Sequence, residues 1–158
     1  MKNFLTIVVA LAVLGAMASM YGVWQHFAPV GSAICNVSDQ FSCDIVNKSP
    51  WSAVFGFPVA GIGVIGYAVL GFLAMRARCG GTQCSTLLSW LLGLTAIGFV
   101  FQVYLTYIEL WVIGVACPIC LISQAAIFGI MVLSVLAWNR VRRDQRSSVQ
   151  QCVCDTVE

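Results

Sequence analysis

Charged residues are scarce in this sequence: they make up 9% of it, against 60% for apolar residues, and the mean hydropathy is +0.93. A composition so poor in charge is typical of a chain that lies within a lipid bilayer. It leaves no room for a soluble catalytic domain beside the apolar segments. The net charge is only +2, and we interpret it as a signal of membrane topology rather than of nucleic-acid binding.

Four apolar stretches are long enough to cross a membrane, since a spanning helix needs roughly 20 consecutive apolar residues. We therefore expect an all-α integral membrane protein, with a four-transmembrane-helix bundle in residues 1–140 and a cytoplasmic tail in residues 141–158. One sizeable loop, at about residues 25–52, joins the first two spans. The spans lie at about residues 4–24, 53–75, 87–108 and 118–138.

The first span has an alternative interpretation. Lys2, the apolar run after it and the triplet Ala16-Met17-Ala18 together resemble a secretory signal peptide with a small-residue cleavage site. The uncharged run continues to Trp24, however, and is longer than the roughly 7 to 15 residues of a signal's apolar region. Cleavage would also remove one helix of the bundle, so we expect a spanning helix here.

The basic residues predict the orientation of the bundle, because Lys and Arg are retained on the cytoplasmic side of a membrane. Seven of the eight fall on one face if both termini are cytoplasmic, and only Lys48 lies on the opposite face. The loop at residues 25–52 and the turn between the last two spans then face outward. The seven are Lys2, Arg76, Arg78, Arg140, Arg142, Arg143 and Arg146.

The eight cysteines divide by compartment in this topology. Disulfides persist outside the cytosol and are reduced within it. In the four cytosolic cysteines we expect unpaired thiols without a shared function. A weak metal site is the alternative there, although two thiolates alone do not complete the four ligands that structural zinc usually takes. The outward set is Cys35, Cys43, Cys117 and Cys120, and the cytosolic set is Cys79, Cys84, Cys152 and Cys154.

The segment CPIC places two cysteines three positions apart at the start of the last span. Pro118 suits the first position of a helix, so Cys117 falls near the N-cap, where the helix dipole favours a thiolate. The thiolate is the form that attacks disulfides, and Cys-X-X-Cys at a helix start is typical of thiol-disulfide oxidoreductases. We expect a redox pair at the outer membrane boundary, within reach of both a lipid-soluble redox molecule and a protein thiol.

The outer loop carries the second pair, in CNVSDQFSC, a polar segment that we expect to move as a carrier of reducing equivalents. After it, Ser49 can N-cap a short helix with Pro50 at its first position. Trp51, Val54 and Phe55 then share one apolar face, which predicts a short interfacial helix lying on the bilayer.

These features together resemble the vitamin K epoxide reductase (VKOR) family over about residues 5–140. The likeness rests on the C-x7-C loop, a Ser six residues after its second Cys, the segment GFPVAGIGVIGY and the CxxC that opens the last span. It implies a four-helix bundle around a quinone. In bacteria it implies reoxidation of a thioredoxin-like periplasmic oxidase of the DsbA type at the inner membrane. The enzyme DsbB is the nearest competitor, but there the CxxC pair comes first along the chain.

The resemblance also implies an order of electron transfer. A reduced partner attacks at Cys35, and electrons leave through Cys43. Cys43 as thiolate attacks the CPIC disulfide at Cys117, and Cys120 passes electrons to the quinone, which is menaquinone or ubiquinone. The residues expected to line the quinone pocket are Ser49, Phe55 and Gln124.

Two departures from the family pattern refine these expectations. Gln124 stands where the vertebrate enzymes have a quinone-contacting Tyr, so vitamin K epoxide is not the expected substrate. No thioredoxin domain follows the bundle in this sequence, so we expect the redox partner to be a separate protein. His26, the only histidine, is expected at the membrane interface, and Glu109 is expected to be solvated, with proton handling near the quinone as the alternative.

The main alternative function is a thiol-based carrier or transporter of a soft metal ion such as Cu(I) or Hg(II). Such a path would need ligands within the spans, since polar groups inside the membrane mark an ion pathway. No cysteine, Met pair or ionisable residue occupies the centre of a predicted span. A tetraspan structural protein with two inert disulfides is a further alternative.

Overall fold

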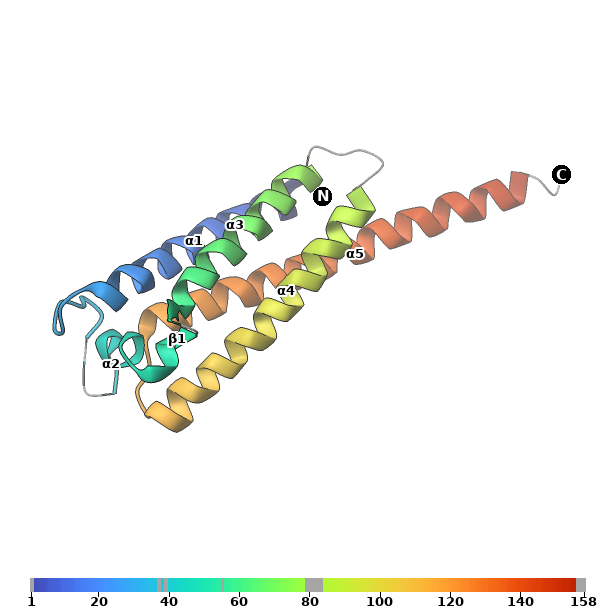
Figure 1. Cartoon of the computed structure of the whole chain (residues 1–158). Helices are drawn as coiled ribbons and strands as arrows, with labels where there is room; N and C mark the ends of the chain where they lie inside the picture. Colours follow the sequence, from blue (N-terminus) through green and yellow to red (C-terminus); the bar gives the residue numbers. More distant parts are fainter. Residues whose placement is uncertain (1, 37, 39, 55, 79–83, 156–158) are drawn as a thin grey trace.

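Four long helices form the body of the protein, as the computed structural model in Figure 1 shows. It describes residues 2–36, 38, 40–54, 56–78 and 84–155, with only the backbone of residues 2, 84 and 144–155. The long helices are α1 (Lys2–Phe27), α3 (Val59–Arg78), α4 (Cys84–Tyr107) and α5 (Pro118–Asp155). In this part of the chain all four are long and apolar enough to cross a membrane. The predicted all-α four-helix bundle is therefore confirmed.

The helices pack through a narrow apolar core. α1 contacts α3 and α5, and α4 contacts α5 and α3. Leu5, Leu88 and Ile130 are fully buried between them. The opposite faces carry exposed large apolar side chains, such as Val100, which is 68% exposed. A bundle whose outer surface is apolar is suited to lipid, where such side chains need no burial in protein.

Tyr67 joins three of these helices. Its ring lies against Gly15 of α1, where an added Cβ would come within 2.4 Å of two ring carbons. Its hydroxyl donates to the Ser123 carbonyl of α5 at 2.7 Å and lies 2.9 Å from the Ser123 hydroxyl. A buried Tyr needs such a partner for its hydroxyl, so this contact fixes α3 against α5.

The second spanning helix begins later than the sequence indicated, at Val59 rather than at residue 53. Before it lie two short strands, β1 (Ala53–Val54) and β2 (Phe57–Pro58), which pair antiparallel with Val54 opposite Phe57. Gly56 turns the chain between them with φ +83, a conformation that glycine adopts readily. Pro58 then limits how far the helix can extend backward, because it has no backbone N–H to donate.

The predicted interfacial helix is shorter than expected. Ser49 is the N-cap of a single 3-10 turn, η1 (Pro50–Ser52), which ends where β1 begins. Another short helix, α2 (Cys43–Asn47), precedes it and was not predicted. α4 continues into a π-helical turn, η2 (Ile108–Ile113), which Gly114 ends with φ +74. α5 runs beyond the predicted span, so the backbone of the tail is helical as far as Asp155.

Candidate active site

The loop between α1 and α3 is held by a carboxylate at its centre. Asp44 accepts hydrogen bonds from the Gly31 backbone N–H at 2.8 Å, from Asn36 Nδ2 at 2.6 Å and from Lys48 Nζ at 2.9 Å. The Lys48 hydrogen bond is the largest cause that lowers the pKa of Asp44 from 3.8 to about 2. These contacts hold the loop in this conformation, and its predicted movement as a carrier stays a prediction.

Two backbone hydrogen bonds join this loop to the segment before α5. The Ser42 N–H donates to the Ala116 carbonyl at 3.1 Å, and the Ala116 N–H donates to the Gln40 carbonyl at 2.9 Å. They form a parallel bridge between Phe41 and Ala116. Cys43 lies two residues after Phe41, and Cys117 directly follows Ala116. The bridge therefore brings the two predicted cysteine pairs together.

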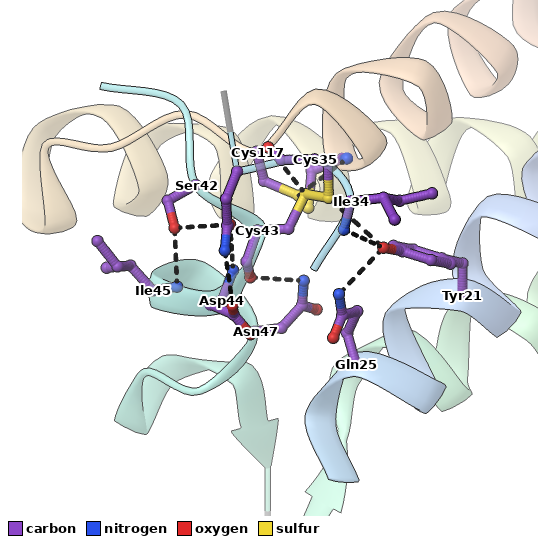
Figure 2. The surroundings of a disulfide bond; sticks show 12 residues. Tyr21, Gln25, Ile34, Cys35, Ser42, Cys43, Asp44, Ile45, Asn47 and Cys117 are labelled. Atoms are coloured by element: carbon purple, nitrogen blue, oxygen red, sulfur yellow. Dashed lines mark hydrogen bonds between the residues drawn. A yellow bond between two sulfur atoms is a disulfide. The ribbon is translucent and has the colours of Figure 1, made fainter. Parts of the chain in front are cut away.

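Three of the sulfur atoms meet in one buried cluster, which Figure 2 shows. Cys35 and Cys43 form a disulfide, and the Cys117 sulfur lies 3.4 Å from the Cys43 sulfur. Cys43 and Cys117 are 0% exposed, while Cys35 is 7% exposed. The Tyr21 hydroxyl accepts from the Ile34 N–H at 3.2 Å and lies 3.9 Å from the Cys35 sulfur. The cluster thus has one slightly exposed side, at Cys35.

Cys117 and Cys120 are free thiols at the start of α5. As the sequence predicted, Pro118 is the first residue of the helix and Cys117 directly precedes it. The Cys120 N–H donates to the Cys117 sulfur at 3.4 Å. Hydrogen bonding from the Cys120 thiol is the largest cause that lowers the pKa of Cys117, and the backbone N–H groups of Cys120 and Ile119 contribute, against burial and the nearby Glu109. The geometry therefore favours Cys117 as the thiol of the pair that loses its proton more readily.

A cavity of about 530 Å³ lies within the bundle beside these thiols. Cys120 is part of its wall, whereas Cys117 is not among its lining residues. Most of the lining is apolar, from α1, α3, α4 and α5. A cavity of this size with few polar groups is typical of a small-molecule site. Its polar side chains include Ser49, Ser52, Tyr67, Gln102, Thr106 and Glu109.

The three predicted pocket residues have different positions. Ser49 lines the cavity, and its hydroxyl donates to the Val46 carbonyl at 2.8 Å. Gln124 is not among the lining residues; its Oε1 accepts a hydrogen bond of 3.3 Å from Thr106, which does line the cavity. Phe55 lies outside the described residues. So does Cys79, and the side chains of Cys84, Cys152 and Cys154 are likewise not described.

Glu109 is the site residue that sequence reasoning placed wrongly. It was expected to be solvated, but it is 4% exposed and its carboxylate accepts a hydrogen bond from the Cys117 N–H. It also lines the cavity. The signal that could have identified it is an acidic residue inside an otherwise uncharged apolar run, eight positions before Cys117.

His26 stands at the end of α1, next to the loop. Its Nδ1 lies 2.9 Å from the Asn47 carbonyl and 3.4 Å from the Ser52 hydroxyl. The first of these contacts joins α1 to α2. Its predicted place at the membrane interface stays a prediction.

Comparison with known protein families agrees with this geometry. The sequence model of the Vitamin K epoxide reductase family matches residues 6–135. The matched region contains α3 and α4, most of α1, the first part of α5, the loop disulfide and the CPIC segment. The chain therefore belongs to the vitamin K epoxide reductase family, a family of membrane thiol oxidoreductases whose members generally use quinones.

Proposed function

We propose that this protein is a quinone-dependent thiol-disulfide oxidoreductase that reoxidises a periplasmic thioredoxin-like partner of the DsbA type. The observation that carries the proposal is the continuous arrangement of four cysteines. The Cys35–Cys43 disulfide reaches the surface at Cys35, Cys43 lies 3.4 Å from Cys117, and Cys120 faces the cavity. In this order, each sulfur atom is close enough to the next for thiol-disulfide exchange without a large movement of the helices.

The partner reacts at the loop. Because Cys43 is fully buried and Cys35 has the only exposed surface of the pair, a partner thiolate attacks the Cys35 sulfur. The Cys35–Cys43 bond breaks, a partner–Cys35 disulfide forms, and Cys43 leaves as a thiolate. Exposed apolar residues flank this point, with Ile34 85% and Val30 84% exposed, and they offer a docking surface to the partner.

The internal exchange follows from the contact between Cys43 and Cys117. When the CPIC pair is oxidised, the Cys43 thiolate attacks Cys117, a Cys43–Cys117 bond forms and Cys120 leaves as a thiolate. The second partner thiol then displaces Cys35, which attacks Cys43 and releases Cys117. In total, the partner gains a disulfide and the CPIC pair gains two electrons and two protons. At that point of the cycle Cys35 and Cys43 form a disulfide and the two CPIC thiols are free, as they are in this structure.

The cavity fits the quinone, either menaquinone or ubiquinone, that this reaction requires. Its apolar lining suits an aromatic ring and an isoprenoid tail, and its few polar side chains can hydrogen-bond carbonyl oxygens. Ser49, Gln102 and Thr106 are the residues that would hold the ring. A bound quinone supplies an acceptor for two electrons and two protons. Cys120 lies at the wall of the same cavity, so the thiol that donates electrons needs no further carrier.

The charge distribution supports an inner-membrane location with both termini cytoplasmic. Figure 1 shows that α3 ends, and α5 extends, at the end of the bundle opposite α2 and the start of α5. Arg76 and Arg78 lie in the last turn of α3, and the Arg140 guanidinium stacks 4.5 Å from the Phe4 ring near the start of α1. Because Lys and Arg favour the cytoplasmic side, the cysteine end then faces the periplasm.

A soft-metal carrier is less well supported by the same arrangement. A carrier needs ligands along the membrane path. The four cysteines with described side chains instead gather at one end of the bundle, around Cys117.

The experiment that tests the proposal is an oxidation assay with purified protein in detergent. A reduced DsbA-like protein is added with and without a short-chain ubiquinone, and the loss of partner thiols is measured together with quinone absorbance. We expect catalytic oxidation only with quinone, one quinone reduced for each partner disulfide formed. Oxidation at the same rate without any added or co-purified quinone would contradict the proposal.

A further inference from the structure

We propose that Glu109 carries a proton from the Cys117 thiol to the cavity when the CPIC pair is oxidised. The inference deepens the function proposed above and rests on it, because it concerns the same thiols and the same cavity. It assigns a chemical task to the one acidic side chain found among the described residues that line that cavity.

The position of Glu109 depends on the π-helical turn η2. A π turn inserts an extra residue into a helix, and such turns often occur at functional sites. Gly114 ends the turn in a left-handed conformation, and the Val115 N–H returns to the Glu109 carbonyl at 3.3 Å. The chain therefore doubles back, and the Cys117 N–H donates to the Glu109 carboxylate. Glu109 thus joins the end of α4 to the start of α5.

The carboxylate is close to both thiols. One carboxylate oxygen of Glu109, the Cys117 sulfur and the Cys120 sulfur all lie within 4.8 Å of one another. Cys117 is fully buried and does not line the cavity, so its proton has no open path of its own. Glu109 lines the cavity and contacts Cys117, and it therefore bridges the two.

This buried acid has no cation beside it in the part of the cavity wall that the structure describes. Among the described residues that line the cavity there is no Lys, Arg or His. The titratable groups that face this region are Cys117 just before α5, Cys120 in α5 and Tyr67 in α3. A charged group inside a membrane is costly and usually functional. If the side chain served only to hold the Cys117 N–H, a neutral Gln would do so at lower cost.

The proton balance of the reaction gives the acid its task. When the Cys117–Cys120 bond forms, two S–H bonds break, and two electrons and two protons pass to the quinone. Cys120 lines the cavity and can release its proton there. The Cys117 proton passes to the Glu109 carboxylate and then into the cavity, and Glu109 ends the cycle unchanged.

The test is a single turnover of the pre-reduced protein with a short-chain ubiquinone, followed by quinone absorbance. Glu109→Gln keeps an acceptor for the Cys117 N–H but cannot take up a proton, and we expect quinone reduction about 100-fold slower, within the range of lost acid-base catalysis. Glu109→Ala should be equally slow and should recover at least tenfold when formate is added, because a small acid can enter the space left behind. Glu109→Gln, which leaves no such space, should not respond to formate.

Two outcomes would overturn the inference. Quinone reduction by Glu109→Gln at the wild-type rate would show that no proton passes through this residue. A slow Glu109→Ala variant that formate does not accelerate would show a structural role only. Failure of the wild-type protein to reduce quinone at all would instead contradict the proposed function. Formation of the Cys35–Cys43 disulfide in each variant checks that the loop has folded.

Discussion

The two ends of the bundle are built differently. The cysteine end holds its residues by hydrogen bonds and short elements: α2, η1, the β1–β2 hairpin and the bridge at Phe41 and Ala116. The remainder of the bundle is four apolar helices in close contact, with fully buried residues such as Leu91 and Ile130. We infer that the helices supply stability and a fixed frame, while the cysteine end supplies the chemistry. Changes at each end should therefore have separable effects.

Substitutions of the CPIC thiols should give the clearest separation between loss of activity and loss of stability. Cys117→Ser and Cys120→Ser each remove a sulfur that the exchange requires, so partner oxidation should fall to the background rate. Their unfolding temperatures should fall far less than the loss of turnover would require, although a Ser hydroxyl in the fully buried place of Cys117 costs some stability. Cys79→Ser and Cys84→Ser are the matched controls and should keep turnover. Loss of activity in the controls, with activity retained in the CPIC variants, would place the chemistry elsewhere.

Substitutions in the core of the four helices should instead act mainly on stability. Gly15→Ala would bring a methyl group within 2.4 Å of the Tyr67 ring, so the ring must shift. Such overpacking costs about 1 to 3 kcal/mol, and the unfolding temperature in detergent should fall.

The matched control for this effect is Gly93→Ala, where nothing lies within 4 Å of the added Cβ. Because Ala favours a helix over Gly, by about 1 kcal/mol, this variant should be as stable as the wild type or more so. Equal destabilisation by both variants would contradict the packing described for Tyr67.

The two ends of the bundle also differ in how far the sequence alone predicts their structure. The spans were predictable because length and apolarity alone determine them, and Pro118 predicted where α5 begins. The hairpin at Val54 and Phe57 was not, because its residues are apolar enough to continue a span. A lone acidic residue in an apolar run marks Glu109 in the sequence, but its contact with the Cys117 N–H depends on the π turn, which the sequence does not specify.

The quinone-pocket residues show the same limit. Ser49 was predicted from its place in the family pattern, and it does line the cavity. Gln124 was predicted by position in the family pattern, but the rotation of α5 directs its hydrogen bond to Thr106. Facing direction on a helix is determined by packing, which a single sequence does not specify.

A smaller effect is expected from the loop carboxylate. The pKa of Asp44 is lowered from 3.8 to about 2 in the folded protein, chiefly by the Lys48 hydrogen bond. A lowered pKa means that the ionised group stabilises the fold above the unfolded pKa, and that this stability is lost as the pH falls from about 4 to 2. We expect a loss of about 1 to 2 kcal/mol over that interval.

The measurement is the unfolding temperature of the oxidised protein at a series of pH values in detergent. Asp44→Asn should be less stable than the wild type at neutral pH and should lack this part of the acid dependence. A variant with the same acid dependence as the wild type would show that another group is responsible.

The central claim is that electrons pass between the two cysteine pairs through Cys43 and Cys117, whose sulfurs lie 3.4 Å apart. Cys120→Ser tests it most directly, because it removes the neighbour that would release Cys117 from an exchange intermediate. In this variant the Cys117 thiolate attacks Cys43 of the loop disulfide, a Cys43–Cys117 bond forms and Cys35 leaves as a thiolate. After incubation with the oxidised partner and alkylation of free thiols, peptide mapping should find this Cys43–Cys117 disulfide. It should be absent when Cys43→Ser is added to the same protein, and the partner should then remain bound to Cys35. A Cys120→Ser protein that instead accumulates a partner–Cys117 disulfide would contradict the account, since the partner would then meet CPIC without the loop.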